Sequence, residues 1–175
     1  PLDRFLTVDS LGSASANFRL EGRYFSWPQA KTSVNAGIRQ LFYKEHEYKD
    51  ITLQATLDKT HLRGTMVSKD PDAPLDLVFR GDSLQQQYQV GLGGYIGKVD
   101  LQALHLMQEP LTMGLKVDLQ GFIGEHSAYA LKARFDSLSM ADSRKTYTLG
   151  SLDIDMASDL KKTTLDVKTG DLQLT

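Results

Sequence analysis

The chain has no cysteine among its 175 residues, only one tryptophan and only five prolines. The lack of cysteine excludes thiol catalysis, zinc–thiolate sites and a disulfide framework. The sequence also lacks an excess of either charge, because 20 basic and 22 acidic residues give a net charge of −2. Nucleic-acid-binding domains normally carry a clear basic excess, and so do polybasic patches that bind membrane surfaces. The composition therefore argues against both of these classes.

The sequence has no apolar run that approaches the roughly 18 residues of a membrane-spanning helix. Apolar residues make up 41% of the chain and the mean hydropathy is −0.32, values that suit one folded domain. The chain begins at Pro1, without an initiating methionine or a basic and apolar leader. We therefore expect it to be a fragment from the interior of a longer protein.

What the sequence does contain is an alternation of apolar and polar residues over most of its length. A period of two is typical of strands with one dry face and one solvated face. Because helical segments are scarce, we predict an all-β fold with a mainly antiparallel, curved sheet. The residues predicted to lie on the dry face are Val34, Ala36, Ile38, Ile51, Leu53, Ala55, Leu57, Leu75, Leu77, Phe79, Leu115, Val117, Leu119, Leu131, Ala133, Phe135, Leu152, Ile154, Met156, Leu165 and Val167.

Polar segments separate the alternating runs about every 10 to 15 residues, as in hairpins and meanders. The predicted turns are residues 44–47, 58–60, 69–72 and 158–161. The segment 99–107 fits two interpretations, one short helix or a strand with a bulge, because its leucines follow a helical stripe only in part.

A repeat of roughly 100 residues is visible in the sequence. A block with proline, aspartate and glycine in register begins at Pro1 and recurs from Pro110. Residues 1–98 would form one unit of a single β-rich fragment, and residues 110–175 would form part of a second unit. The segment 28–38 interrupts the correspondence, which leaves the strand pairing there open.

Two clusters carry residue types that occur in ligand sites. The glycine-rich segment 91–97 lacks both the glycine spacing of a dinucleotide loop and a clear helix after it, so we interpret it as a turn, bulge or kink. Asp70, Asp72 and Asp76 lack the ordered set of oxygen ligands of a calcium loop. We expect no metal and no cofactor.

The histidines give no catalytic or zinc signature. His46 lies between two glutamates, in a turn that we expect to be solvated. No nucleophile elbow accompanies the serines and aspartates, so we predict no catalytic residue and no enzyme activity. None of the four histidines forms the i, i+4 pair of a helical zinc site; they are His46, His61, His105 and His126.

Alternation alone leaves two functional hypotheses open. The apolar sides of the strands could meet in the closed core of a structural or adhesive β-sandwich or solenoid. They could equally line an open, curved sheet whose dry face holds lipid. The period of two is the same in both cases.

The segment 38–53 resembles a recurring hairpin of the TamB family, within the AsmA-like group of bridge-like lipid transfer proteins. The family hairpin reads I-x-x-L-x-Y, a polar turn, then Y-x-x-I-x-L. The stretches 66–79, 99–106 and 110–121 resemble the next hairpin, the DL-x-x-L-x-L element and the PL…D-L-x-G strand of the same repeat. The hairpin positions in this chain are Ile38, Leu41, Tyr43, Tyr48, Ile51 and Leu53.

This resemblance implies an envelope protein of a double-membraned bacterium, a translocation and assembly module anchored in the inner membrane with a periplasmic body. It implies a sheet folded lengthwise into an elongated U-shaped trough, a β-taco, that moves phospholipid between the inner and outer membranes. It also implies a partner, an outer-membrane β-barrel assembly factor, bound through regions outside this fragment. The residues of the dry face would then contact acyl chains. Open strand edges would allow the isolated fragment to dimerise.

Overall fold

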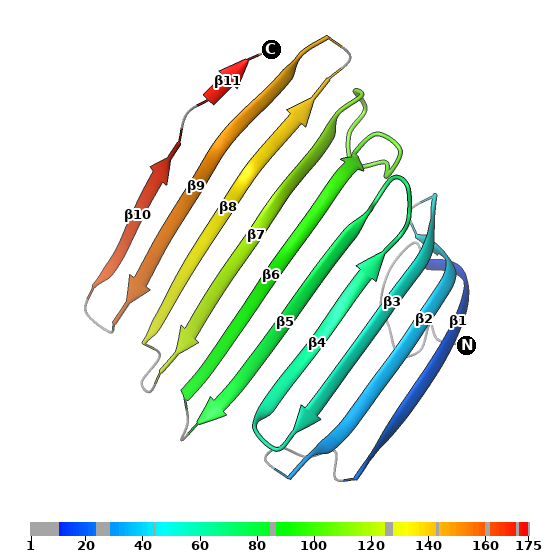
Figure 1. Ribbon diagram of the computed structural model, residues 1–175, viewed down its shortest axis with the longest axis vertical. Helices are drawn as coiled ribbons and strands as arrows, with labels where there is room; N and C mark the ends of the chain where they lie inside the picture. The colour runs from blue at the N-terminus through cyan, green and yellow to red at the C-terminus, as the bar shows by residue number, and fades with distance from the viewer. Residues whose placement is uncertain are drawn as a thin grey trace.

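Eleven strands in one sheet make up the regular structure of the described residues (Figure 1). The computed structural model describes residues 11–23, 29–43, 45–84, 87–124, 128–142, 144–159, 162–170 and 172–174. The strands are β1 Leu11–Arg23, β2 Lys31–Tyr43, β3 His46–Asp58, β4 His61–Ser68, β5 Leu75–Leu84, β6 Gln87–Asp100, β7 Thr112–Ile123, β8 Tyr129–Ala141, β9 Thr146–Ser158, β10 Thr163–Thr169 and β11 Leu172–Leu174.

The sheet is an open antiparallel meander. Strands β1 to β10 follow one another in space in the order of the sequence, and β11 pairs with β9 next to the end of β10. Each strand from β2 to β10 is antiparallel to the one before it, as expected when short connections join neighbours. Figure 1 shows β1 and β10 on opposite sides of a single layer. The predicted all-β fold is confirmed, and an open sheet of this kind is consistent with a trough.

The turns lie close to the predicted places. Lys59 has a φ of 54° in the tight connection between β3 and β4, and residues 69–74 connect β4 to β5. Glu45 has a φ of 66° before β3, so the predicted turn 44–47 ends earlier than expected and His46 already lies in the strand. Of the predicted turn 158–161, residues 160 and 161 lie outside the described residues.

Of the segment 28–38, whose pairing was left open, residue 28 lies outside the described residues and residues 31–38 belong to β2. β2 pairs with β3 from Lys31 opposite Asp58 to Tyr43 opposite His46, and it pairs with β1 on its other side, where two register irregularities occur. Residues 1–10 and 24–28 lie outside the described residues, so the proposed repeat of residues 1–98 and 110–175 stays a prediction.

The segment 99–107 does not form the short helix that we considered, and it follows the alternative, a strand with a bulge, only as far as Asp100. The pairing of β6 with β7 shifts between Ile96 and Val99, and the chain then leaves the sheet as a loop. The carboxylate of Asp100 accepts hydrogen bonds from the backbone of Gln102 and Ala103, which starts one helical turn. The turn ends at His105, which has a φ of 56°. A single turn is too short to be stable as a helix. Among the described residues no helix is long and apolar enough to span a membrane.

The described residues contain no second layer that covers the sheet. The chain exposes 12482 Å² of surface, whereas a compact protein of its mass, 19.5 kDa, exposes roughly 8500 Å². The two-sheet sandwich is therefore not the observed fold. The buried apolar residues in the described part of the chain are Ala30, Ile51, Leu104, Leu115, Val117 and Ala133.

Candidate functional site

One face of the sheet is apolar from edge to edge, and we call it the dry face. Its side chains form rows that cross the strands, because residues opposite one another in adjacent strands lie on the same face. One row across β1–β10 is Leu20, Val34, Ala55, Gly64, Phe79, Leu92, Leu119, Ala133, Ile154 and Val167. The next row is Phe18, Ala36, Leu53, Met66, Leu77, Gly94, Val117, Phe135, Leu152 and Thr169.

Two further rows extend the dry face along the strands. On one side of the central rows the register aligns Thr32, Leu57, Leu62, Gly81, Val90, Gly121, Leu131, Met156 and Leu165. On the other side it aligns Ala16, Ile38, Ile51, Ser68, Leu75, Ile96 and Leu115. Every residue that the alternation assigned to the dry face, from Val34 to Val167, lies in one of these four rows.

The opposite face, which we call the polar face, carries most of the charge. A one-residue offset in each strand is enough to separate the two faces. One polar row is Arg19, Asn35, Gln54, Thr65, Val78, Gly93, Asp118, Arg134, Asp153 and Lys168.

Neighbouring side chains of the dry face shield one another although no layer covers them. In β3, Leu53, Ala55 and Leu57 are half-buried, while the alternate residues Gln54 and Thr56 are exposed. At the two lateral edges this shielding ends, because an edge strand has a neighbour on one side only. Phe18 in β1 is 66% exposed and Leu165 in β10 is 64% exposed.

Glycines let large dry-face side chains lie flat on the sheet. A Cβ added at Gly64 would collide with the ring of Phe79, which therefore covers the glycine. A Cβ added at Gly121 would come within 2.6 Å of a methyl group of Val90. These glycines interrupt the alternation of β4 and β7, yet they continue the dry face, because the neighbouring side chain fills the space above them.

Several dry-face residues were not predicted from the alternation, because glycines interrupt it. Glycine at positions 64 and 94 breaks the apolar pattern of β4 and β6, so these strands gave too weak a signal. The register itself recovers them. The missed residues are Leu62, Met66, Leu92 and Ile96.

Exposed ion pairs occupy the polar face. The guanidinium of Arg134 lies 3.0 Å from the carboxylate of Asp136 and 3.8 Å from that of Asp153 on the next strand, and the bond to Asp136 raises the pKa of Arg134. Hydrogen bonds from His61 and then Arg63 lower the pKa of Asp82. Exposed pairs add little stability, so this face serves mainly to stay solvated.

The dry face is a broad surface rather than a pocket. Shallow depressions in the described residues are lined mainly by side chains of the polar face, such as Arg80, Asp118 and Lys132. A surface without a deep recess offers no single tight binding point. It suits a ligand that is recognised by its apolar character over a large area.

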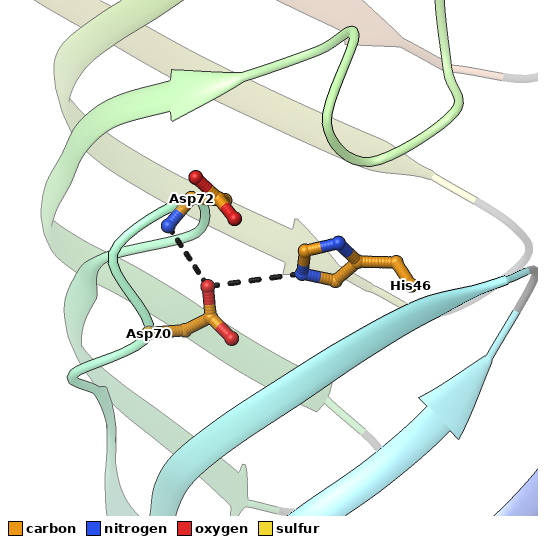
Figure 2. Close-up of side chains that lie close together, drawn as sticks. All are labelled: His46, Asp70 and Asp72. Atoms are coloured by element: carbon orange, nitrogen blue, oxygen red, sulfur yellow. Dashed lines mark hydrogen bonds and ion pairs between the residues drawn. The ribbon is translucent and has the colours of Figure 1, made fainter.

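The expectation of a solvated His46 is wrong. This side chain is only 9% exposed, and it lies beside Asp70, which is 1% exposed, and Asp72 (Figure 2). Residues from two other segments cover it, which the flanking glutamates could not indicate. Asp76, by contrast, lies within β5 on the polar face, so the three aspartates do not form one cluster.

The other candidate residues lie apart from this cluster. His61 pairs with Asp82 on the polar face, and His105 is exposed in the 101–107 loop. His126 lies outside the described residues. The glycine-rich segment 91–97 is part of β6, where Gly94 has a φ of 148°, so the interpretation as a bulge or kink fits better than a turn.

Comparisons with family models, with curated proteins and with solved structures gave no match. The relation to the TamB family accordingly rests on the sequence resemblance alone.

Proposed function

We propose that the dry face binds the acyl chains of phospholipids, and that the chain is an interior segment of a TamB-like hydrophobic conduit. The conduit would lie in the periplasm and carry phospholipid between the inner and outer membranes. One observation carries this proposal: an apolar face continues across ten strands, and nothing in the described part of the chain covers it.

The size of the dry face supports the proposal. Ten strands about 4.8 Å apart give a width of about 43 Å, and four rows about 7 Å apart extend about 20 Å along the strands. The resulting patch of roughly 900 Å² exceeds the roughly 300–600 Å² of the largest apolar patch on a typical monomer. Patches of this size mark sites that bind a partner or a lipid.

The energetics of lipid transfer suit such a surface. Exposing an acyl chain of about 16 methylenes to water costs on the order of 13 kcal/mol, at about 0.8 kcal/mol per methylene. A continuous apolar lining removes most of this cost at every position. Because the face has no deep pocket, no position would hold the chain much more tightly than the next, and the lipid can move on.

The proposed partner follows from the resemblance alone. A TamB-like protein would contact an outer-membrane β-barrel assembly factor through regions outside this fragment, which gives it a role in envelope assembly. The alternative function is a structural or adhesive module. Since one sheet cannot form a closed core by itself, that function would require a second sheet, for example from another copy, to cover the dry face.

Leu77 and Val78 provide a matched pair for the test, because they are adjacent in β5 and lie on opposite faces. We expect Leu77→Asp to weaken binding of a fluorescent long-chain phospholipid at least tenfold, since it places a charge in the middle of the dry face. Val78→Asp should bind like the wild type. Circular dichroism checks that both variants keep the sheet.

Three outcomes would contradict the proposal. The wild type could fail to bind the phospholipid, or the two variants could bind it equally. In the third outcome Leu77→Asp dissociates a face-to-face dimer and lipid binding does not change, which would favour the structural module.

A further inference from the structure

Three segments that are distant in sequence meet around a polar cluster at one end of the sheet, in which His46 and Asp70 are buried and Asp72 is half-buried. The start of β3 contributes His46, and the β4–β5 connection contributes Asp70 and Asp72 (Figure 2). The 101–107 loop contributes the carbonyl of Ala103. The cluster lies outside the four rows of the dry face, so an inference drawn from it is independent of lipid binding.

Asp70 is a rigidly held buried carboxylate. One of its oxygens accepts a hydrogen bond from the backbone of Lys49 at 2.7 Å, and the other accepts bonds from the backbone of Asp72 and Ala73 at 2.9 and 3.1 Å. These neutral donors fix its position. The only basic side chain recorded within ion-pair distance of it in the described residues is the imidazole of His46.

The tautomer of His46 follows from its contacts. Its Nδ1 lies 3.0 Å from the carbonyl oxygen of Ala103, which can only accept a hydrogen bond, so Nδ1 carries the hydrogen. In a neutral ring Nε2 then carries a lone pair and no hydrogen. This nitrogen is buried, has no hydrogen-bond partner, and lies 3.8 Å from a carboxylate oxygen of Asp70. A buried lone pair that faces a carboxylate oxygen is a position that a cation can fill.

Asp72 adds a second carboxylate next to His46. Its carboxylate belongs to the same cluster, and one ligand atom from each of His46, Asp70 and Asp72 lies within 4.8 Å of the others. The cluster therefore holds two carboxylates and one imidazole. A divalent cation would neutralise both and would use the free lone pair of the histidine.

We propose that His46 Nε2, a carboxylate oxygen of Asp70 and a carboxylate oxygen of Asp72 bind one divalent transition-metal ion of the Zn²⁺ type. One imidazole and two carboxylates form a donor set that such ions accept, with water at the remaining positions. The bond from Nδ1–H to the Ala103 carbonyl is the kind of second contact that orients a metal-binding histidine. The bound ion ties β3 to the 69–74 connection, and through His46 to the loop that holds Ala103.

The test adds Zn²⁺ to the chain after treatment with a chelator and measures bound metal and thermal stability. We expect one tightly bound ion per chain and a rise in Tm of about 5–10 °C at a hundredfold excess over Kd. Asp72→Asn should abolish both effects and still fold without metal, because the backbone N–H of residue 72 that bonds Asp70 is kept. Asp76→Asn, four residues away on the polar face, is the control and should bind like the wild type.

The absence of saturable Zn²⁺ binding would overturn the proposal. Binding that survives in Asp72→Asn but is lost in His61→Gln would also overturn it, because the ion would then lie at the exposed His61–Asp82 pair. A direct readout is the ¹⁵N shift of His46 Nε2, which should change on addition of Zn²⁺ while Nδ1 keeps its hydrogen.

Discussion

At the scale of single residues, the two adjacent glycines of β6 have different roles. Gly94 has a φ of 148°, a conformation that side chains rarely adopt, and a Cβ there would collide with the backbone carbonyl of Asp76 in β5. Gly93 faces the other way, and the nearest atom to a Cβ at that position, the carbonyl oxygen of Val117, lies 3.8 Å away. Of these two positions, only residue 94 requires glycine.

We therefore predict that Gly94→Ala lowers the free energy of unfolding by about 1–3 kcal/mol, from backbone strain and the collision with β5. Gly93→Ala should leave it unchanged or slightly higher, because alanine fits and reduces the entropy of the unfolded chain. Urea denaturation of the two variants measures the difference. Equal stability of both would show that β5 and β6 do not approach as closely at residue 94 as the structure has them.

At the scale of strands, the sheet ends in two edges, β1 on one side and β10 with β11 on the other. β10 and β11 share the last edge, since both pair with β9, and the backbone N–H of Gly170 also bonds Ser151 of β9. Even so, Leu165 and Val167 in β10 are 64% and 51% exposed. An edge with unpaired backbone groups and apolar side chains is a site where another strand can add.

We predict that the isolated chain self-associates through this edge. The double variant Leu165→Lys and Val167→Lys should weaken association at least tenfold, since charge on an edge strand opposes pairing. Thr164→Lys, on the polar face of the same strand, should weaken it less. Sedimentation velocity over a range of concentrations measures the strength of self-association. A wild type that is monomeric throughout, or a double variant that associates like the wild type, would contradict the prediction.

The faces of most strands were predictable from the sequence because alternation is a local property. In β3 the alternation from Ile51 to Leu57 is enough to predict which side chains share a face. The buried position of His46 was not predictable, because the residues that cover it come from a loop 57 positions away. For residues 99–107 the sequence left a short helix and a bulged strand open, and the structure keeps a bulged strand only as far as Asp100, because Asp100 and His105 turn the loop back after one turn.

At the scale of the whole molecule, the account depends on a surface that the chain leaves uncovered. An open sheet with one apolar face is unfavourable in water, and the surface area of 12482 Å² reflects this. In the TamB-like interpretation, the lipid and the neighbouring segments of a longer trough would contact this face. In the alternative, another protein sheet would cover it. What touches the dry face therefore decides between the two functions.

Photocrosslinking in the presence of phospholipid vesicles identifies that contact most directly. A photoreactive residue is placed at Leu53, Val117 or Ile154 on the dry face, and at Gln54 or Asp118 on the polar face. Mass spectrometry then identifies the adduct at each position. The account predicts phospholipid adducts at the first three positions and none at the other two. Protein adducts alone on the dry face, or lipid adducts on the polar face instead, would contradict it.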